Sequence, residues 1–181
     1  MNASYAKLVA ADTVRFERIL PGPIERVWAF LTESGKRARW LAAGAMELHV
    51  GGRVELVFRN SDLTENDDPP PEKYAGYGAE SRMDGRITAC EPPRLLAYTW
   101  GGESGSGASE VRFELGAQGD EVRLLLTHTR LPNREQMLSV AGGWHAHLAL
   151  LSDHLADRNP DGFWRTHTRL ESEYERLIPP A

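Results

Sequence analysis

The chain has 181 residues, of which 41% are hydrophobic and 26% are charged, values that are ordinary for a globular protein. It carries 21 Lys and Arg against 26 Asp and Glu, a net charge of −5, and its basic residues are not clustered. These properties argue against intrinsic disorder and against a partner bound mainly through phosphates, such as nucleic acid. The single cysteine, Cys90, excludes an internal disulfide and a cysteine-based zinc site.

No segment of the sequence reaches the roughly 20 apolar residues that span a bilayer. Residues 1–13 also lack the basic-then-apolar order of a signal peptide. We therefore expect a cytoplasmic protein without membrane attachment. The sequence does not set the oligomeric state, so a monomer and a homodimer both stay open.

The first part of the chain is predicted to contain a strand and two short helices. Apolar and polar residues alternate from residue 14 to 19, which indicates a strand. Pro23 suits the first position of a helix, because its missing N–H group costs nothing there. A second short helix is expected over residues 36–41. The first of these helices has apolar residues at helical spacing: Ile24, Val27, Trp28 and Leu31.

From Met46 onward the hydrophobic period changes to two, which predicts a run of about six antiparallel strands. The first two are joined by a tight turn at Gly51-Gly52. Residues 60–82 form a long polar loop, and loops of this length are often mobile or functional. A glycine- and serine-rich stretch, 101–107, separates two later strands. The expected strands are 46–50, 54–58, 86–90, 95–100, 111–115 and 122–129.

The strongest periodic signal follows Pro132, where six apolar residues share one face of a long helix: Met137, Ala141, Trp144, Leu148, Leu151 and Leu155. Gly142-Gly143 inside this helix indicates the close approach of another backbone, or a bend. A last helix after residue 162 has one apolar face, and we expect it to dock on the domain. Because a lone amphipathic helix must cover one face of the sheet, the fold class is α+β.

Four segments, taken in order, resemble the SRPBCC (START-like) superfamily, and within it the C-terminal domain family of the heat-shock protein 90 ATPase activators (AHSA type). They are residues 23–28, the Gly51-Gly52 turn, residues 91–95 and residues 143–148. The resemblance implies a helix-grip fold, in which a curved antiparallel sheet wraps around the long helix and leaves a hydrophobic cavity beneath it. The implied division is a leader (1–11), a START-like domain (12–156) and a docked helical extension (157–181).

Several large side chains and one histidine lie on the strands and helices that are expected to surround that cavity. Small-molecule pockets are lined mostly by such side chains, although aromatic residues at this spacing are also typical of a plain core. The candidate ligand-binding residues are Trp40, Phe58, Tyr98, Trp100, Phe113, His128, Trp144 and Leu148.

Histidines are the natural candidates for chemistry. His128 is in phase with the apolar residues of its strand, so it could contact a ligand, act as an acid or base, or be satisfied by a backbone carbonyl. On a helix, His145 and His147 point about 160° apart, and His154 lies about 10 Å along the axis from His147. No metal site is therefore predicted, and no cofactor or catalytic nucleophile motif is present.

Three functions stay open, since members of this superfamily include lipid carriers, polyketide cyclases and hormone receptors. The leading hypothesis is a non-enzymatic protein that binds a hydrophobic or amphipathic small molecule in the cavity. The second is a co-chaperone-like module that binds a protein partner through the sheet edge or the 60–82 loop. The third is a cyclase- or hydrolase-type enzyme that uses His128.

Overall fold

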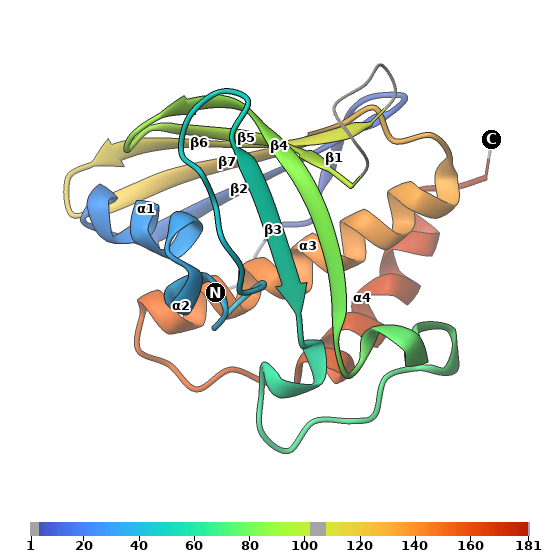
Figure 1. The fold of residues 1–181 in the computed structure, drawn as a ribbon. Helices are drawn as coiled ribbons and strands as arrows, with labels where there is room; N and C mark the ends of the chain where they lie inside the picture. The colour runs from blue at the N-terminus through green and yellow to red at the C-terminus, as the bar shows by residue number, and fades with distance from the viewer. Residues whose placement is uncertain (1–3, 102–107, 181) are drawn as a thin grey trace.

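The computed structural model describes residues 4–101 and 108–180. Seven antiparallel strands form one open, curved sheet in the order β1-β2-β7-β6-β5-β4-β3, and the sheet wraps around a long helix (Figure 1). This confirms the α+β, helix-grip class. The strands are β1 (Lys7–Ala10), β2 (Thr13–Pro21), β3 (Arg53–Phe58), β4 (Ser81–Glu91), β5 (Leu95–Trp100), β6 (Ser109–Gln118) and β7 (Glu121–Thr129).

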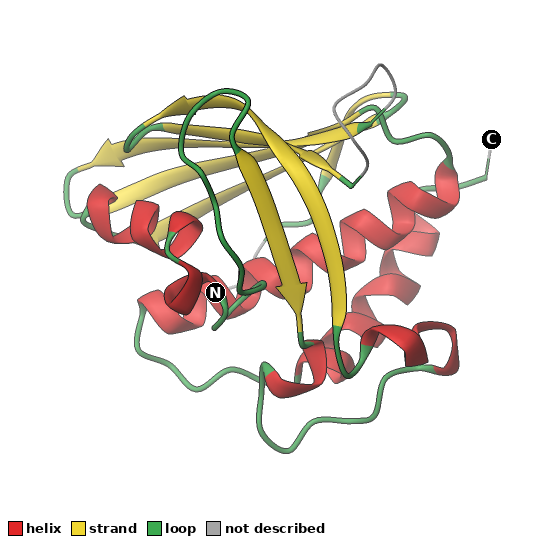
Figure 2. Cartoon of the chain, in the orientation of Figure 1, coloured by secondary structure: helices red, strands yellow, loops and turns green. Residues whose placement is uncertain are grey.

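The helices lie on the concave side of the sheet and at its end (Figure 2). The long helix α3 crosses the concave face, and α4 packs against α3. Two short 3-10 helices, η1 and η2, lie in the connection between β3 and β4, beside α4. The bounds are α1 (Ile24–Thr32), α2 (Ser34–Arg37), η1 (Asn60–Asp62), η2 (Glu72–Tyr77), α3 (Arg134–Leu155) and α4 (Phe163–Leu177).

The start of α3 and its packing on α4 both follow from the sequence. The Asn133 side chain accepts a hydrogen bond of 2.9 Å from the backbone N–H of Gln136, which caps the helix. A Cβ atom added to Gly142 would lie 3.7 Å from the Cα atom of Glu171 in α4. The glycine thus marks the close approach of a second backbone, as predicted, and α4 docks through its apolar face.

The bend of β4 is the feature that opens one end of the fold. This strand pairs with β3 over residues 81–86 and with β5 over residues 87–91. At the junction, a Cβ atom on Gly85 would lie only 2.3 Å from the carbonyl oxygen of Thr99, so any side chain would force the strands apart. Glycine therefore allows β4 to pass close to β5 at this point. Before it, the first half of β4, together with β3, curves away from the rest of the sheet (Figure 1).

The prediction of a strand over residues 46–50 is wrong. Met46 forms only an isolated bridge with Val54, and a tight turn follows it. Leu48 and Val50 are 41% and 69% exposed, so the apolar residues of this segment are not buried against another layer of the protein. The sequence pattern was local, whereas a strand needs a neighbour along its whole length.

Two other segments differ from the prediction. β1 lies within the segment interpreted as a leader, and pairs with β2 through Lys7 and Arg15. The second short helix begins at Ser34 and ends at Arg37 rather than spanning residues 36–41. At its end, the buried guanidinium of Arg37 donates to the carbonyl oxygens of Thr32, the last residue of α1 (2.9 Å), and of the loop residues Ala42 (3.1 Å) and Gly44 (2.5 Å). Most of the glycine- and serine-rich stretch, 102–107, lies outside the described residues.

Across residues 4–101 and 108–180, no helix is both long enough and apolar enough to cross a membrane.

Candidate ligand-binding site

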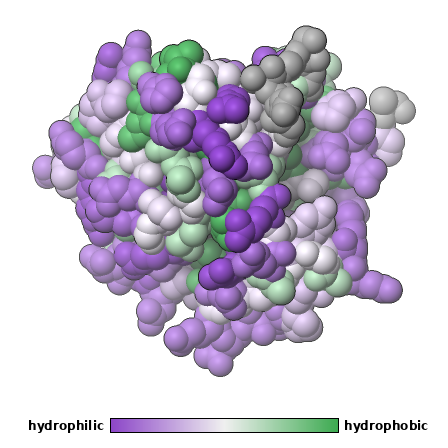
Figure 3. All heavy atoms as spheres, in the orientation of Figure 1, coloured by the Kyte–Doolittle hydropathy of each residue, from purple (hydrophilic) through white to green (hydrophobic). Residues whose placement is uncertain are grey.

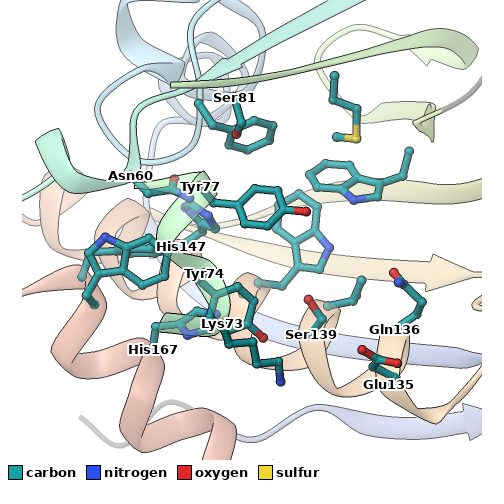
Figure 4. Close-up of a pocket in the computed structure, with 18 of the residues that line it drawn as sticks. Asn60, Lys73, Tyr74, Tyr77, Ser81, Glu135, Gln136, Ser139, His147 and His167 are labelled. Carbon is teal, nitrogen blue, oxygen red and sulfur yellow. The ribbon is translucent and has the colours of Figure 1, made fainter. Parts of the chain in front are cut away.

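A cavity of about 470 Å³ lies where β3 and β4 face η2, α3 and α4 (Figure 4). This volume falls within the range of small-molecule pockets, roughly 300–1,000 Å³. The face shown in Figure 3 is largely hydrophilic, with small groups of hydrophobic residues, one of them near its centre. The cavity is lined by many aromatic side chains: Phe58, Tyr74, Tyr77, Trp100, Trp144, Phe163 and Trp164.

The inner wall is formed by residues at the ends of strands and by α3. Phe58 ends β3, Trp100 ends β5, and Trp144 lies midway along α3. The ring centroids of Phe58 and Trp100 are 6.0 Å apart, and those of Trp100 and Trp144 are 4.9 Å apart. These contacts hold the three rings as one continuous apolar surface.

The outer wall is formed by η2, which is tied to α4 by polar contacts. Glu171 accepts hydrogen bonds from Lys73 Nζ at 2.6 Å and from the Tyr74 hydroxyl at 2.8 Å. Burial raises the pKa of Glu171, but these hydrogen bonds outweigh it and hold the pKa below its usual value. Tyr74 also stacks on Trp164, whereas Tyr77 is 55% exposed and reaches over the pocket (Figure 4).

The loop that carries η2 is anchored at the start of α4. Both carboxylate oxygens of Asp67 accept backbone N–H groups there, from Trp164 at 2.7 Å and Arg165 at 3.2 Å. Thr64 accepts a third, from Phe163, at 2.9 Å. A carboxylate is favoured at a helix N-terminus by these free N–H groups and by the helix dipole. The 60–82 loop is thus fixed to α4, and the cavity wall is formed before any ligand binds.

The polar groups of the cavity are mostly uncharged. His147 donates its Nδ1–H to the carbonyl oxygen of Trp40 at 2.7 Å, which leaves Nε2 as an acceptor. Burial lowers the pKa of His147 to about 4, so the ring is neutral at pH 7. Burial also lowers the pKa of His167, whose Nδ1 has no hydrogen-bond partner. With Lys73 paired to Glu171, the site suits an uncharged or amphipathic ligand.

The structure divides the eight candidate residues into two groups. Phe58, Trp100 and Trp144 line the cavity. The other five are not among its lining residues and are at most 1% exposed: Trp40, Tyr98, Phe113, His128 and Leu148.

His128 belongs to the packed group, behind the indole rings of Trp100 and Trp144. Its Nδ1 accepts a hydrogen bond of 3.0 Å from Trp144 Nε1, so its Nε2–H donates to Ser109 Oγ at 2.9 Å. Burial lowers its pKa to about 3. The prediction that His128 points inward was correct. Two side chains, rather than a backbone carbonyl, are hydrogen-bonded to its ring nitrogens, and His128 does not line the cavity.

The sequence reasoning missed the residues that close the cavity, which come from η2 and from α4. Tyr74 and Tyr77 were a usable signal, because two tyrosines three residues apart are unusual in an otherwise polar loop. His147 was considered only as a metal ligand. Within the described ranges, no three His, Cys, Asp or Glu side chains lie close enough together to hold a metal ion.

Comparison with known proteins identifies the family. The family model described as "Activator of Hsp90 ATPase homolog 1-like protein" matches residues 21–156, whereas no curated protein matches. Among solved structures, the protein encoded by gene BPP1335 from Bordetella parapertussis is 46% identical, with a TM-score of 0.81 over 99% of this chain and 97% of that chain.

Two more distant structures share the fold. CalU16 from Micromonospora echinospora is 21% identical, with a TM-score of 0.66 over 97% of this chain and 96% of that chain. The Aha1 dimer from Colwellia psychrerythraea is 15% identical, with a TM-score of 0.55 over 79% of this chain and 95% of that chain. The chain belongs to the family of activator of Hsp90 ATPase homolog 1-like proteins, and it has the START-like fold of the SRPBCC superfamily.

Proposed function

We propose that this protein binds a hydrophobic or amphipathic small molecule in the cavity between β3, β4, η2, α3 and α4, without catalysing a reaction. The observation that carries the proposal is the aromatic lining of a cavity of about 470 Å³ whose outer wall is held by hydrogen bonds to α4. A pre-formed apolar cavity binds a ligand without first having to order its own wall.

The polar groups support a ligand with a neutral polar group rather than a negative charge. The Lys73 ammonium is already paired with Glu171 at 2.6 Å, and the two lining histidines, His147 and His167, have lowered pKa values. His147 Nε2 is a ready acceptor for a ligand hydroxyl. Arg82, which also lines the cavity, pairs with Glu80 at 3.2 Å, so an anionic ligand would find no free counter-ion on these side chains.

The enzyme hypothesis gains no support from the position of His128. A general acid or base must reach the substrate within hydrogen-bonding distance. Both ring nitrogens of His128 are bonded to protein side chains, and the residue is fully buried. Binding without turnover is therefore the function that this arrangement favours.

Gly143 offers a direct test, because it lines the cavity and a Cβ atom added there would meet no atom within 4 Å. The probe is N-phenyl-1-naphthylamine, a neutral aromatic molecule whose fluorescence rises in apolar surroundings. We expect saturable binding by the wild-type protein and by Gly143→Ala. Gly143→Leu should abolish it, since the larger side chain extends into the cavity.

Ala149→Leu is the matched control, because Ala149 lies on the same helix but lines a different cavity. It should bind the probe as the wild type does. Unfolding curves of all variants establish that each is folded. Equal probe binding by wild type and Gly143→Leu, or no saturable binding by the wild type, would contradict the proposal.

Family membership favours a second candidate, a co-chaperone-like interaction with a heat-shock protein 90 ATPase. Its test is the ATPase rate of that chaperone with and without this protein. Deletion of the 60–82 loop is not a suitable test of this candidate, because Asp67 in that loop caps α4 and the deletion would remove the cap as well. An unchanged ATPase rate would exclude activation of the chaperone tested.

A further inference from the structure

A second cavity, of about 570 Å³, lies on the other side of α3. Its walls come from the segment before β1, from β2, and from α3 and α4. It combines a few apolar side chains with several charged ones. The residues that matter for the argument are Tyr5, Arg18, His145, Ala149, Asp153 and Arg169.

Arg18 on the wall of this cavity is buried without a counter-ion. The residue is 6% exposed, and burial lowers its pKa. Its Nη1 donates to the carbonyl oxygens of Ser4 at 2.9 Å and Glu17 at 2.7 Å. Its Nε and Nη2 are buried and have no hydrogen-bond partner. An unpaired buried charge is costly, so proteins normally supply a partner for it.

Arg37, the other buried arginine, provides a comparison, because the protein itself satisfies its guanidinium group. Its Nε, Nη1 and Nη2 all donate to backbone carbonyls. In Arg18, by contrast, the unpartnered atoms are the two that form one edge of the guanidinium. That edge presents two parallel N–H groups, the arrangement that a carboxylate accepts in a bidentate manner.

Neighbouring groups reinforce this reading. The Tyr174 hydroxyl accepts from the backbone N–H of Ala6 at 2.8 Å and lies 2.8 Å from His145 Nδ1. The Tyr174 hydroxyl and the His145 ring are therefore hydrogen-bonded to each other beside this cavity. The charged lining residues are three arginines (18, 158 and 169) and two acids (Glu17 and Asp153), an excess of 3 − 2 = +1.

The other lining charges already have partners. Asp153 pairs with Arg158 at 3.0 Å, Glu17 with Arg123 at 2.7 Å, and Arg169 with Glu173 at 3.7 Å. Arg18 is thus the lining cation whose charge is left to a ligand, and two carboxylates on the same wall would repel a second negative charge.

We propose that this second cavity binds a small organic monocarboxylate, which places its carboxylate on the Nε–Nη2 edge of Arg18 and its apolar part against Tyr5, Ile19 and Leu170. Because both nitrogens are buried, binding requires a local opening of the structure around Arg18. Tyr5 lines the cavity and is 40% exposed, so an opening on this side would have to break the hydrogen bond from its hydroxyl to Glu173. This site is independent of the one proposed above.

The test is a titration of the 15N-labelled protein followed by NMR, with the arginine Nε–H signals included. Sodium benzoate is the probe, and benzyl alcohol and inorganic phosphate are the comparisons at equal ionic strength. Arg18→Lys keeps the charge but removes the paired edge, and it also assigns the Arg18 Nε–H signal. Ala149→Leu narrows this cavity, and Gly143→Leu narrows the first one.

We expect benzoate to shift the Arg18 Nε–H signal saturably, while benzyl alcohol and phosphate leave it in place. Arg18→Lys should bind benzoate about tenfold more weakly or worse, because a hydrogen bond to a charged group contributes that much. Ala149→Leu should also weaken benzoate binding, and Gly143→Leu should not.

The proposal would be overturned by no shift of the Arg18 Nε–H signal with benzoate, by equal benzoate affinity in Arg18→Lys, or by a preference for phosphate. Shifts confined to the first cavity would overturn it as well. If Arg18→Lys does not fold, the proposal is tested by the Arg18 Nε–H shift in the wild-type protein and by the benzoate affinity of Ala149→Leu. Because Gly143→Leu and Ala149→Leu affect different cavities, failure of this proposal is separable from failure of the first.

Discussion

The interior beneath the sheet has two halves that meet at Trp100 and Trp144. Beneath β6 and β7 the space is filled: Phe113 and Leu126 are at most 1% exposed, and the Phe113 ring packs edge-on against Trp144. Beneath β3 and the bent end of β4, the sheet faces η2 and α4 across the cavity. The same sheet and the same helix therefore provide a core at one end and a binding site at the other.

Two histidines show the same contrast at the level of single groups. In the packed half, both ring nitrogens of His128 are bonded to side chains. At the cavity, His147 uses only Nδ1 for the protein, in a 2.7 Å hydrogen bond to Trp40, and keeps Nε2 as an acceptor. A buried histidine is a candidate for binding when one nitrogen remains unused, and neither burial nor the direction of the pKa shift separates the two cases.

Truncation of an aromatic residue in the packed half should give the largest effect. Phe113→Ala should lower the free energy of unfolding by about 3–5 kcal/mol, because it leaves a void in a filled core. Tyr77→Ala, at the cavity, should change it by less than about 1 kcal/mol, since that side chain is 55% exposed. Urea unfolding at pH 7 measures both. Similar losses in the two variants would erase the distinction between the halves.

Stability should fall as the solution is acidified below pH 6.5. Burial lowers the pKa of His128 to about 3, and those of His145 and His147 to about 4, from the model-compound value of 6.5. Between those values the unfolded chain binds more protons than the folded protein, so stability is present above pH 6.5 and is lost toward pH 4.

We expect a loss of about 1 kcal/mol or more per pH unit in that window. Urea midpoints at pH 7, 6 and 5 measure it. His128→Asn should reduce the slope, because it removes one of the three groups. Constant stability from pH 7 to pH 5 would show that these histidines are not buried as described.

His128→Asn should also cost about 1–3 kcal/mol at pH 7, because it disturbs the buried hydrogen bonds with Trp144 and Ser109. Binding of N-phenyl-1-naphthylamine should persist, since His128 does not line the cavity. Thermal unfolding and the fluorescence titration provide the two readouts. An unchanged melting temperature together with lost binding would instead place His128 in the site.

Gly143→Ala should give the smallest effect, a gain of up to about 1 kcal/mol. Alanine has the higher helix propensity, and its methyl group meets no atom at this position. The measurement is the urea midpoint relative to wild type. A loss of stability would mean that the cavity wall closes more tightly over α3 than the structure shows.

The fold could be predicted because its signals are local. Alternation over the later strands and the step of three or four residues along α3 each report which face is buried. Residues 46–50 show the limit of this reasoning, since Met46 to Val50 alternate without a neighbouring strand that spans them. Pairing is decided by the rest of the sheet.

The site was only partly predictable, for two reasons. Alternation shows that Tyr98 and Phe113 point inward, but it does not show whether they pack against other side chains or line a cavity. The outer wall depends on Asp67 capping α4, a contact between Asp67 and Trp164 that are 97 residues apart in sequence. Neither fact has a local signature, whereas Trp100 and Trp144 were found because they are inward-facing aromatic residues on elements expected to surround the cavity.

The binding of a small molecule between β3, β4, η2 and α3 is tested most directly by intermolecular NOEs between N-phenyl-1-naphthylamine and the protein. We expect NOEs from the probe to Phe58, Tyr77 and Trp100, and their loss in Gly143→Leu. NOEs confined to other surfaces, or none to these three residues, would contradict the proposed site.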